Sequence, residues 1–135
     1  MTSGYSGTPL VKKLNLRDGM RVWFDAMPEH VIDEIDEYAL ELFFVADPAE
    51  GIDAAHIFVT TRAALEAHLT ALRFQISSEG QIWVSWPKKA AKVETDITED
   101  TIREIALPLG LVDTKVSAID EVWSGLKLVI RKELR

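Results

Sequence analysis

The sequence predicts one α/β domain of three layers, in which a mixed, mainly parallel sheet of about six strands lies between helices. The chain has 135 residues, the length of one ordinary domain. Short apolar runs alternate with helical patterns along most of it, and this alternation predicts parallel strands joined by helical crossovers. The last two apolar runs are joined too closely for such a crossover, so they form an antiparallel hairpin. We therefore expect a single domain over residues 1–135.

The first half of the chain predicts two helices and two strands after a flexible start. Residues 1–7 are mostly small and indicate an arm or strap. Thr8-Pro9 is typical of a helix start, because a capping hydroxyl precedes a proline at the first helical position. A strand follows from Val22, and a second helix opens at Pro28. The strongly apolar run at residues 40–46 then predicts a second strand.

The second half of the chain predicts the other four strands and two helices. Thr61 is a suitable helix cap, and the leucines behind it, spaced by four and then three residues, define one buried face. In chain order, the predicted elements are a strand at residues 55–59, a helix after Thr61, a strand at 82–86, a helix after Thr98, and two strands at 112–119 and 122–130.

The composition excludes several classes of protein. The chain has no cysteine, which excludes disulfides, thiolate metal sites and cysteine nucleophiles. It has no apolar run of 18 residues that could span a membrane, and no apolar leader at its start, so we expect a cytoplasmic protein. The formal net charge of -7 opposes binding to nucleic acid.

The acidic charge is concentrated in one segment. Residues 25–53 hold ten of the 22 acidic side chains and no lysine or arginine. The rest of the chain carries 15 basic and 12 acidic residues. Two interpretations remain open for this segment: a solvated surface that keeps the protein soluble, or a docking surface for a basic protein partner.

Short motifs near the start and in the second half of the chain carry a family resemblance. They are Lys13-Leu14, Gly19, Val22, Ile82-Trp83-Val84, Pro87-Lys88, Gly110-Leu111, Trp123-Ser124-Gly125 and Leu128-Val129. Together they resemble a bacterial family known as domain of unknown function 3052. More distantly, the chain is similar to class I methyltransferase-like Rossmann domains. This likeness implies a strand order of 2-1-3-4-6-5, with the sixth strand antiparallel to its neighbours, and the family resemblance implies no activity.

The cofactor site of such domains is not evident in the sequence. S-adenosylmethionine and NAD sites need glycines after the first strand, so that the backbone can approach the cofactor. This chain has no glycine between Met20 and Glu50. Pro28 removes one N–H donor there, and Glu29 places negative charge where a pyrophosphate would bind. We therefore expect neither cofactor. Only Asp47, after the second strand, fits the position of a ribose-binding carboxylate; the alternative is a simple turn residue.

Basic residues near two predicted strand ends define a candidate anion site. Lys88 and Lys89 follow one strand, and Thr61 and Arg62 follow its neighbour at the start of a helix, whose N–H groups attract anions. The glycine-bearing start of the chain could close over the same rim. The residues that it would add are Gly4, Ser6, Gly7 and Thr8. The alternative is that the lysines are solvated or pair with Asp96, Glu99 and Asp100.

The remaining chemistry is sparse. His30, His56 and His68 do not form a metal-binding pattern, so we expect no metal; His56 lies within an apolar strand and reads as a core residue. No catalytic residue is identified, and we lean away from an enzyme. Three hypotheses follow: a non-enzymatic binding or regulatory domain on a degenerate methyltransferase-like scaffold, a protein or enzyme that binds a small anionic ligand at the basic rim, and an interaction protein that uses the acidic segment. Monomer and homodimer both remain open.

Overall fold

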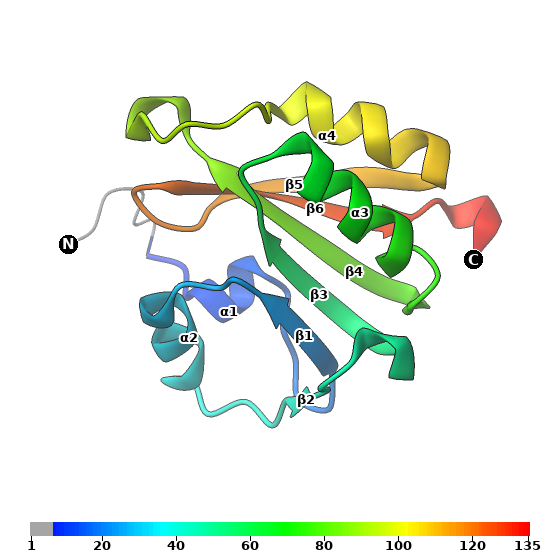
Figure 1. Ribbon diagram of the computed structural model, residues 1–135. Coiled ribbons are helices and arrows are strands. Elements are labelled where there is room, and N and C mark those ends of the chain that lie inside the picture. The colour runs from blue at the N-terminus through cyan, green and yellow to red at the C-terminus, as the bar shows by residue number, and fades with distance from the viewer. Residues whose placement is uncertain (1–6) are drawn as a thin grey trace.

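The computed structural model describes residues 7–135 and contains the predicted order of elements (Figure 1). The helices are α1 (Leu10–Lys13), α2 (Glu29–Asp36), α3 (Arg62–Leu72) and α4 (Glu99–Ala106). The strands are β1 (Arg21–Asp25), β2 (Phe43–Phe44), β3 (Ile52–Phe58), β4 (Ile76–Pro87), β5 (Leu111–Ala118) and β6 (Trp123–Ile130). Four short 3-10 turns, η1 to η4, lie between or after them. The predicted N-terminal arm falls outside the described residues, except for Gly7.

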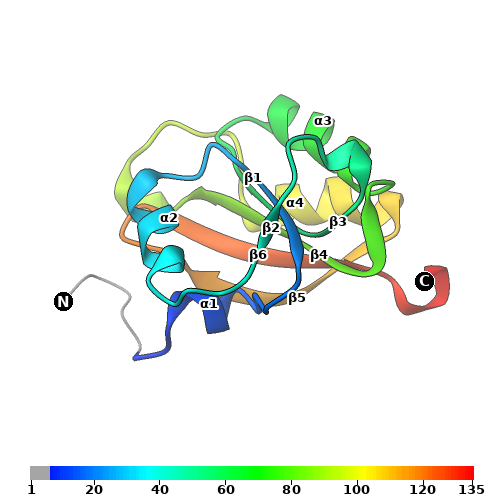
Figure 2. The same ribbon diagram turned by 90° about the horizontal axis from the view of Figure 1, so that it is seen from below.

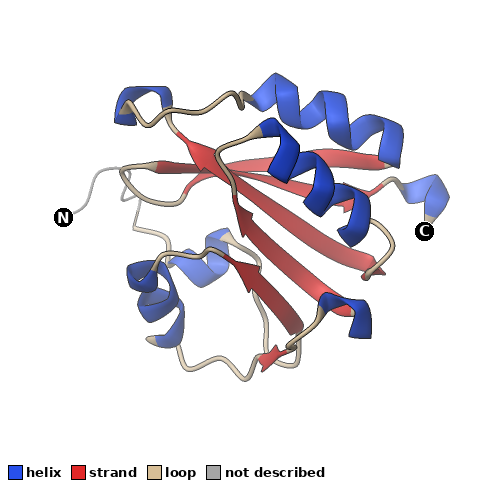
Figure 3. Ribbon diagram, viewed as in Figure 1, coloured by secondary structure: helices blue, strands red, loops and turns tan. Residues whose placement is uncertain are grey.

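One six-stranded sheet runs through the molecule in the order β2-β1-β3-β4-β6-β5 (Figure 3). The pairs β1–β2, β1–β3 and β3–β4 are parallel. Strand β6 is antiparallel to both β4 and β5. The predicted fold class, strand order and terminal hairpin are therefore confirmed.

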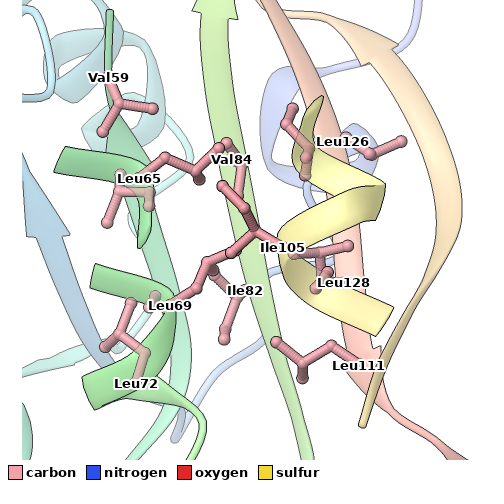
Figure 4. Close-up of a cluster of buried hydrophobic side chains, with 14 of the residues drawn as sticks. Val59, Leu65, Leu69, Leu72, Ile82, Val84, Ile105, Leu111, Leu126 and Leu128 are labelled. Atoms are coloured by element: carbon pink, nitrogen blue, oxygen red, sulfur yellow. The ribbon is translucent and has the colours of Figure 1, made fainter. Parts of the chain in front are cut away.

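Helices α3 and α4 cover one face of this sheet and enclose the larger part of the core (Figure 4). The three leucines predicted to share a face of α3 are all buried: Leu65, Leu69 and Leu72. They meet apolar side chains from the central strand β4, including Ile82 and Val84. Each such side chain contributes about 1.5–3 kcal/mol when it leaves water.

Helix α1 is held against the opposite face of the sheet by its carboxyl-terminal carbonyl groups. The main-chain oxygen of Leu14 accepts hydrogen bonds from Gln81 Nε2 at 2.7 Å and from Trp83 Nε1 at 3.0 Å. The oxygen of Lys13 accepts a third bond, from Lys115 Nζ at 2.6 Å. The last carbonyls of a helix have no partner within it, so side chains of the sheet satisfy them here. Leu14 itself is fully buried.

Two details at the start and edge of the sheet differ from prediction. The first helix is capped by Pro9 rather than Thr8, and no side chain bonds to its amino end. The apolar run at residues 40–46 pairs only at Phe43 and Phe44, each 60% exposed, so the strand is shorter than the run predicts. Strand β2 lies at the edge of the sheet as the predicted order places it, and among the described residues it pairs with β1 alone.

We predict that Leu14→Ala lowers the free energy of unfolding by about 2–5 kcal/mol, because it leaves a cavity beneath α1. Urea denaturation followed by tryptophan fluorescence measures the change. Lys12→Ala, on the exposed side of the same helix, is the matched control and should change stability by less than about 0.5 kcal/mol. Equal losses in the two variants would show that α1 adds little to the core.

Candidate functional site

The carboxyl ends of the parallel strands β1, β3 and β4 point to the same edge of the sheet (Figure 1). Ligands of open α/β sheets bind at this edge. It carries the start of α3 with Thr61 and Arg62, and the η2 turn (Lys89–Ala91) with Lys88 and Lys89. The chemistry available at the edge depends on what these groups already contact.

The amino end of α3 is occupied by a carboxylate of the protein itself. Thr61 caps the helix as predicted, and its Oγ1 accepts a hydrogen bond from the Ala64 N–H at 3.2 Å. The N–H of Arg62 donates to Asp96 Oδ1 at 2.6 Å. Thr95 anchors this loop, because its hydroxyl donates to the carbonyl of Thr60 at 2.6 Å. Asp96 therefore stands where an external anion would meet the helix dipole.

The side chain of Arg62 is directed away from the predicted rim. Its Nη1 lies 2.9 Å from Glu104 Oε2 on α4. A surface pocket of about 450 Å³ lies beside Thr60 and Thr61, and its other lining residues are Glu94, Thr95 and Asp96. Two carboxylates on this pocket make it unfavourable for an anion.

The lysines after β4 pair with none of the three carboxylates that the sequence suggested as partners. The Lys88 N–H donates to the carbonyl of Val122 at 2.7 Å, which fixes the backbone but not the ammonium group. Within residues 7–135, no ion pair involves Lys88 or Lys89, and no hydrogen bond joins them to Arg62. Glu99 and Asp100, their expected partners, pair with Arg103 instead.

The rest of the predicted rim is not assembled around these lysines in the described part of the chain. Gly7 and Thr8 are exposed, and Gly4 and Ser6 lie outside the described residues. The anion site at this edge stays a prediction.

The loop after β1 differs from a cofactor loop in its backbone and in its contacts. Ala26 adopts a left-handed conformation with φ of 56°, where glycine would be unstrained. Helix α2 begins after Pro28 with no side-chain cap and with Glu29 in its first turn. His30 Nε2 then lies 2.7 Å from Asp120 Oδ2 in the β5–β6 turn.

Another histidine links the end of β1 to α3. His68 Nε2 lies 3.1 Å from Asp25 Oδ2, and its ring is 5.9 Å from that of Trp23. His30 and His68 each lie against a carboxylate that is distant in the sequence. The local sequence around each histidine could not predict these pairs.

Asp47 lies before the η1 turn (Pro48–Glu50), which leads directly into the amino end of β3. Its Oδ1 accepts a hydrogen bond from the Ala49 N–H at 2.9 Å. Only the 3-10 helix η1 separates β2 from β3, so Asp47 lies near the amino end of β3 and not at the edge where β1 and β3 end. The geometry gives this carboxylate a capping role, and the ribose-binding role stays a prediction.

Two polar side chains form a pair inside the sheet, beneath α1 and α2. His56 Nε2 lies 2.7 Å from Ser85 Oγ, and the imidazole stacks on Phe58 at 4.5 Å. Burial lowers the pKa of His56 to about 3, so the ring is neutral at pH 7. A hydroxyl beside an imidazole is the arrangement of an activated nucleophile, but both residues are fully enclosed. The prediction of a core histidine is confirmed.

The acidic segment 25–53 covers one side of the molecule. Val31 and Ile35 of α2 are buried, whereas Asp33, Glu34 and Asp36 are exposed. This pattern is compatible with both interpretations of the segment, so the basic partner stays a prediction. Among residues 7–135 there is no cluster of three metal-ligating side chains, and no helix is long and apolar enough to cross a membrane.

The sheet order and its parallel crossovers are those of the class I methyltransferase-like Rossmann fold. The chain belongs to the family described as "Protein of unknown function (DUF3052)", which matches residues 12–132. No curated protein matches the sequence.

Solved structures show the same fold at low sequence identity. Ribosomal protein L11 methylase from Lactobacillus delbrueckii subsp. bulgaricus is 9% identical with a TM-score of 0.55, over 90% of this chain and 75% of that one. TrmN from Thermus thermophilus is 13% identical with a TM-score of 0.55; 90% of this chain matches 47% of TrmN, so the chain spans about half its length. Aeropyrum pernix fibrillarin, in complex with natively bound S-adenosyl-L-methionine, is 14% identical with a TM-score of 0.51, over 93% of this chain and 70% of that one. These identities support a common fold and nothing more.

We predict that Asp96→Ala lowers the free energy of unfolding by about 1–2 kcal/mol, because the first N–H of α3 loses its charged acceptor. Chemical denaturation measures the loss. Glu94→Ala is the matched control, since Glu94 lines the same pocket but makes no hydrogen bond to the described residues. A similar small effect in both variants would mean that Asp96 is not a cap.

We also predict a pH dependence of stability that arises from His56. Below pH 6.5 the unfolded chain binds a proton that buried His56 does not, so the free energy of unfolding falls as the pH drops towards 3. The contribution of this one group is about 1.4 kcal/mol per pH unit. Urea denaturation between pH 4.5 and 7 should give a shallower slope for His56→Gln than for the wild type. His68→Gln serves as the control, and an unchanged slope in His56→Gln would contradict the prediction.

Proposed function

We propose that the protein is a non-catalytic binding domain built on a methyltransferase-like scaffold. The observation that carries this proposal is the hydrogen bond from the Arg62 N–H to Asp96. In a ligand-binding α/β sheet, this helix start would be open to an external anion. Here a carboxylate of the same chain holds it, and charge repulsion disfavours a second anion.

Contacts around the β1 loop support the same proposal. Methyltransferase folds bind S-adenosylmethionine at the loops after β1 and β2. In this chain the cofactor would meet Pro28, Glu29 and a loop without glycine. The residues present therefore do not fit that cofactor, and we propose that the domain works without it. Asp25 and His30, which flank this loop, are each paired with a side chain distant in sequence.

The proposal is also supported by the few reactive groups in the described part of the chain. The hydroxyl and imidazole that meet there, Ser85 and His56, are buried on the face of the sheet beneath α1 and α2. Their burial keeps both groups away from solvent and therefore from a substrate in solution. We further propose that the protein acts in the bacterial cytoplasm, as the family resemblance suggests.

Titration calorimetry with S-adenosylmethionine tests the proposal. We expect no saturable heat at millimolar cofactor and no rise in melting temperature. A true ligand present at about 100 times its Kd would add roughly 2.7 kcal/mol of stability. A methyltransferase of the same fold, titrated in parallel, provides the positive control. Saturable binding, or transfer of a labelled methyl group to any acceptor, would overturn the proposal.

A further inference from the structure

A second group of basic residues lies on the opposite face of the sheet, beside α1. It consists of Lys115 on β5, Lys127 on β6 and Arg17 in the loop after α1, and we call it the basic patch. Figure 2 shows α1 beside β5 and β6, and the hydrogen bond from Lys115 to Lys13 confirms this contact. None of the three residues belongs to the rim considered above.

The two lysines of the basic patch face one another across the hairpin. Lys115 and Lys127 are direct partners in the antiparallel register of β5 and β6. Side chains that are directly opposite have Cβ atoms about 4.5–5.5 Å apart, and like charges at such positions destabilise a sheet. Both lysines are half-buried, so water screens their repulsion only partly.

The surroundings of the basic patch do not neutralise it. Lys115 Nζ donates to the Lys13 carbonyl, and Lys127 Nζ donates to Asn15 Oδ1 at 3.2 Å. Both acceptors are uncharged. Across residues 7–135, no carboxylate forms an ion pair with either lysine or with Arg17, although the chain has 22 acidic residues. Burial lowers the pKa of Lys127, and the charges of Lys115 and Arg17 lower it further.

Attachment of α1 does not by itself explain these charges. The neutral side chain of Gln81 donates to the adjacent Leu14 carbonyl without the free-energy cost of burying a charge. An ammonium group carries three N–H donors, and each lysine uses one of them in the contacts described. Cations that repel one another and keep donors in reserve are suited to a multivalent anion, which would bridge them.

We infer that Arg17, Lys115 and Lys127 form a binding site for a phosphate group, either as a free anion or as part of a small phosphorylated molecule. The anion would bridge the two lysines and accept hydrogen bonds from them and from the guanidinium of Arg17. Such charge-assisted bonds are about twice as strong as neutral ones. This site lies apart from the strand edge at the start of α3. A negative result for phosphate would therefore leave the proposal about S-adenosylmethionine untouched, and the reverse also holds.

Titration of the full chain with sodium pyrophosphate tests the inference, with chloride added to hold the ionic strength constant. We expect saturable heat and a higher melting temperature for the wild type. Inorganic phosphate and ADP form two further arms: tighter binding of ADP would identify a nucleotide as the source of the phosphate. Pyrophosphate that acts no differently from chloride would overturn the inference.

Three variants locate the site. Arg17→Gln is the sharpest, because the exposed Arg17 side chain makes no hydrogen bond to the described residues and its loss leaves the attachment of α1 intact. It should weaken pyrophosphate binding about tenfold at unchanged stability, the loss expected for one charged hydrogen bond. Lys127→Gln should weaken binding at least as much. Lys88→Gln combined with Lys89→Gln is the control and should bind like the wild type.

The outcomes separate the two roles of the lysines. If the lysines serve only to hold α1, replacement of Lys127 should lower stability. Arg17→Gln should then bind pyrophosphate as the wild type does, and that result would overturn the inference. Loss of binding in the control variant alone would place the anion at the strand edge and would also overturn it. Changes in amide chemical shifts at residues 15–17, 115 and 127 on addition of pyrophosphate would support the site directly.

Discussion

The carbonyl of Leu14 is the point at which the start of the chain is attached to the centre of the sheet. It accepts hydrogen bonds from Gln81 and Trp83, which lie 67 and 69 residues further along the chain on the central strand β4. Because α1 has only four residues, it could not persist in water without these contacts. Its attachment covers the face of the sheet that contains His56 and brings Arg17 near β6. The attachment of α1 therefore both buries His56 and places Arg17 beside the lysines of the basic patch.

At the strand edge, the start of α3 is bonded to a carboxylate of the same chain, whereas in a cofactor-binding domain such a helix start is open to a ligand. A helix dipole and its N–H groups favour an anion regardless of its source. Supplying Asp96 from the loop before α4 satisfies the start of α3 and ties α4 to α3 at the same time. The short η1 connection between β2 and β3 leads from Asp47 directly into the amino end of β3, away from the edge where β1 and β3 end. Two local features of the chain thus determine the contacts at the strand edge, within a sheet order that is that of the methyltransferase-like fold.

The sequence predicted the features that depend on neighbouring residues and missed those that depend on the register of distant ones. The order of elements, the Thr61 cap, the buried leucines of α3 and the core position of His56 all follow from local periodicity. The short length of β2 was missed because the apolar run at residues 40–46 does not show where pairing with β1 ends. The pairs Arg62–Asp96 and His30–Asp120 join residues 34 and 90 positions apart, and no local pattern marks them.

The two groups of lysines in this protein show why the number of basic residues close together in the sequence is a poor guide to anion binding. Lys88 and Lys89 are adjacent in sequence and conspicuous, but no ion pair within the described residues orients their side chains, so a ligand would have to order them at an entropic cost. Lys115 and Lys127 are 12 residues apart and inconspicuous, yet the register of the β5–β6 hairpin and their bonds to α1 hold them in place. Their mutual repulsion is already present in the folded protein, and an anion relieves it on arrival. Preorganised charge of this kind favours binding more than a larger number of mobile charges does.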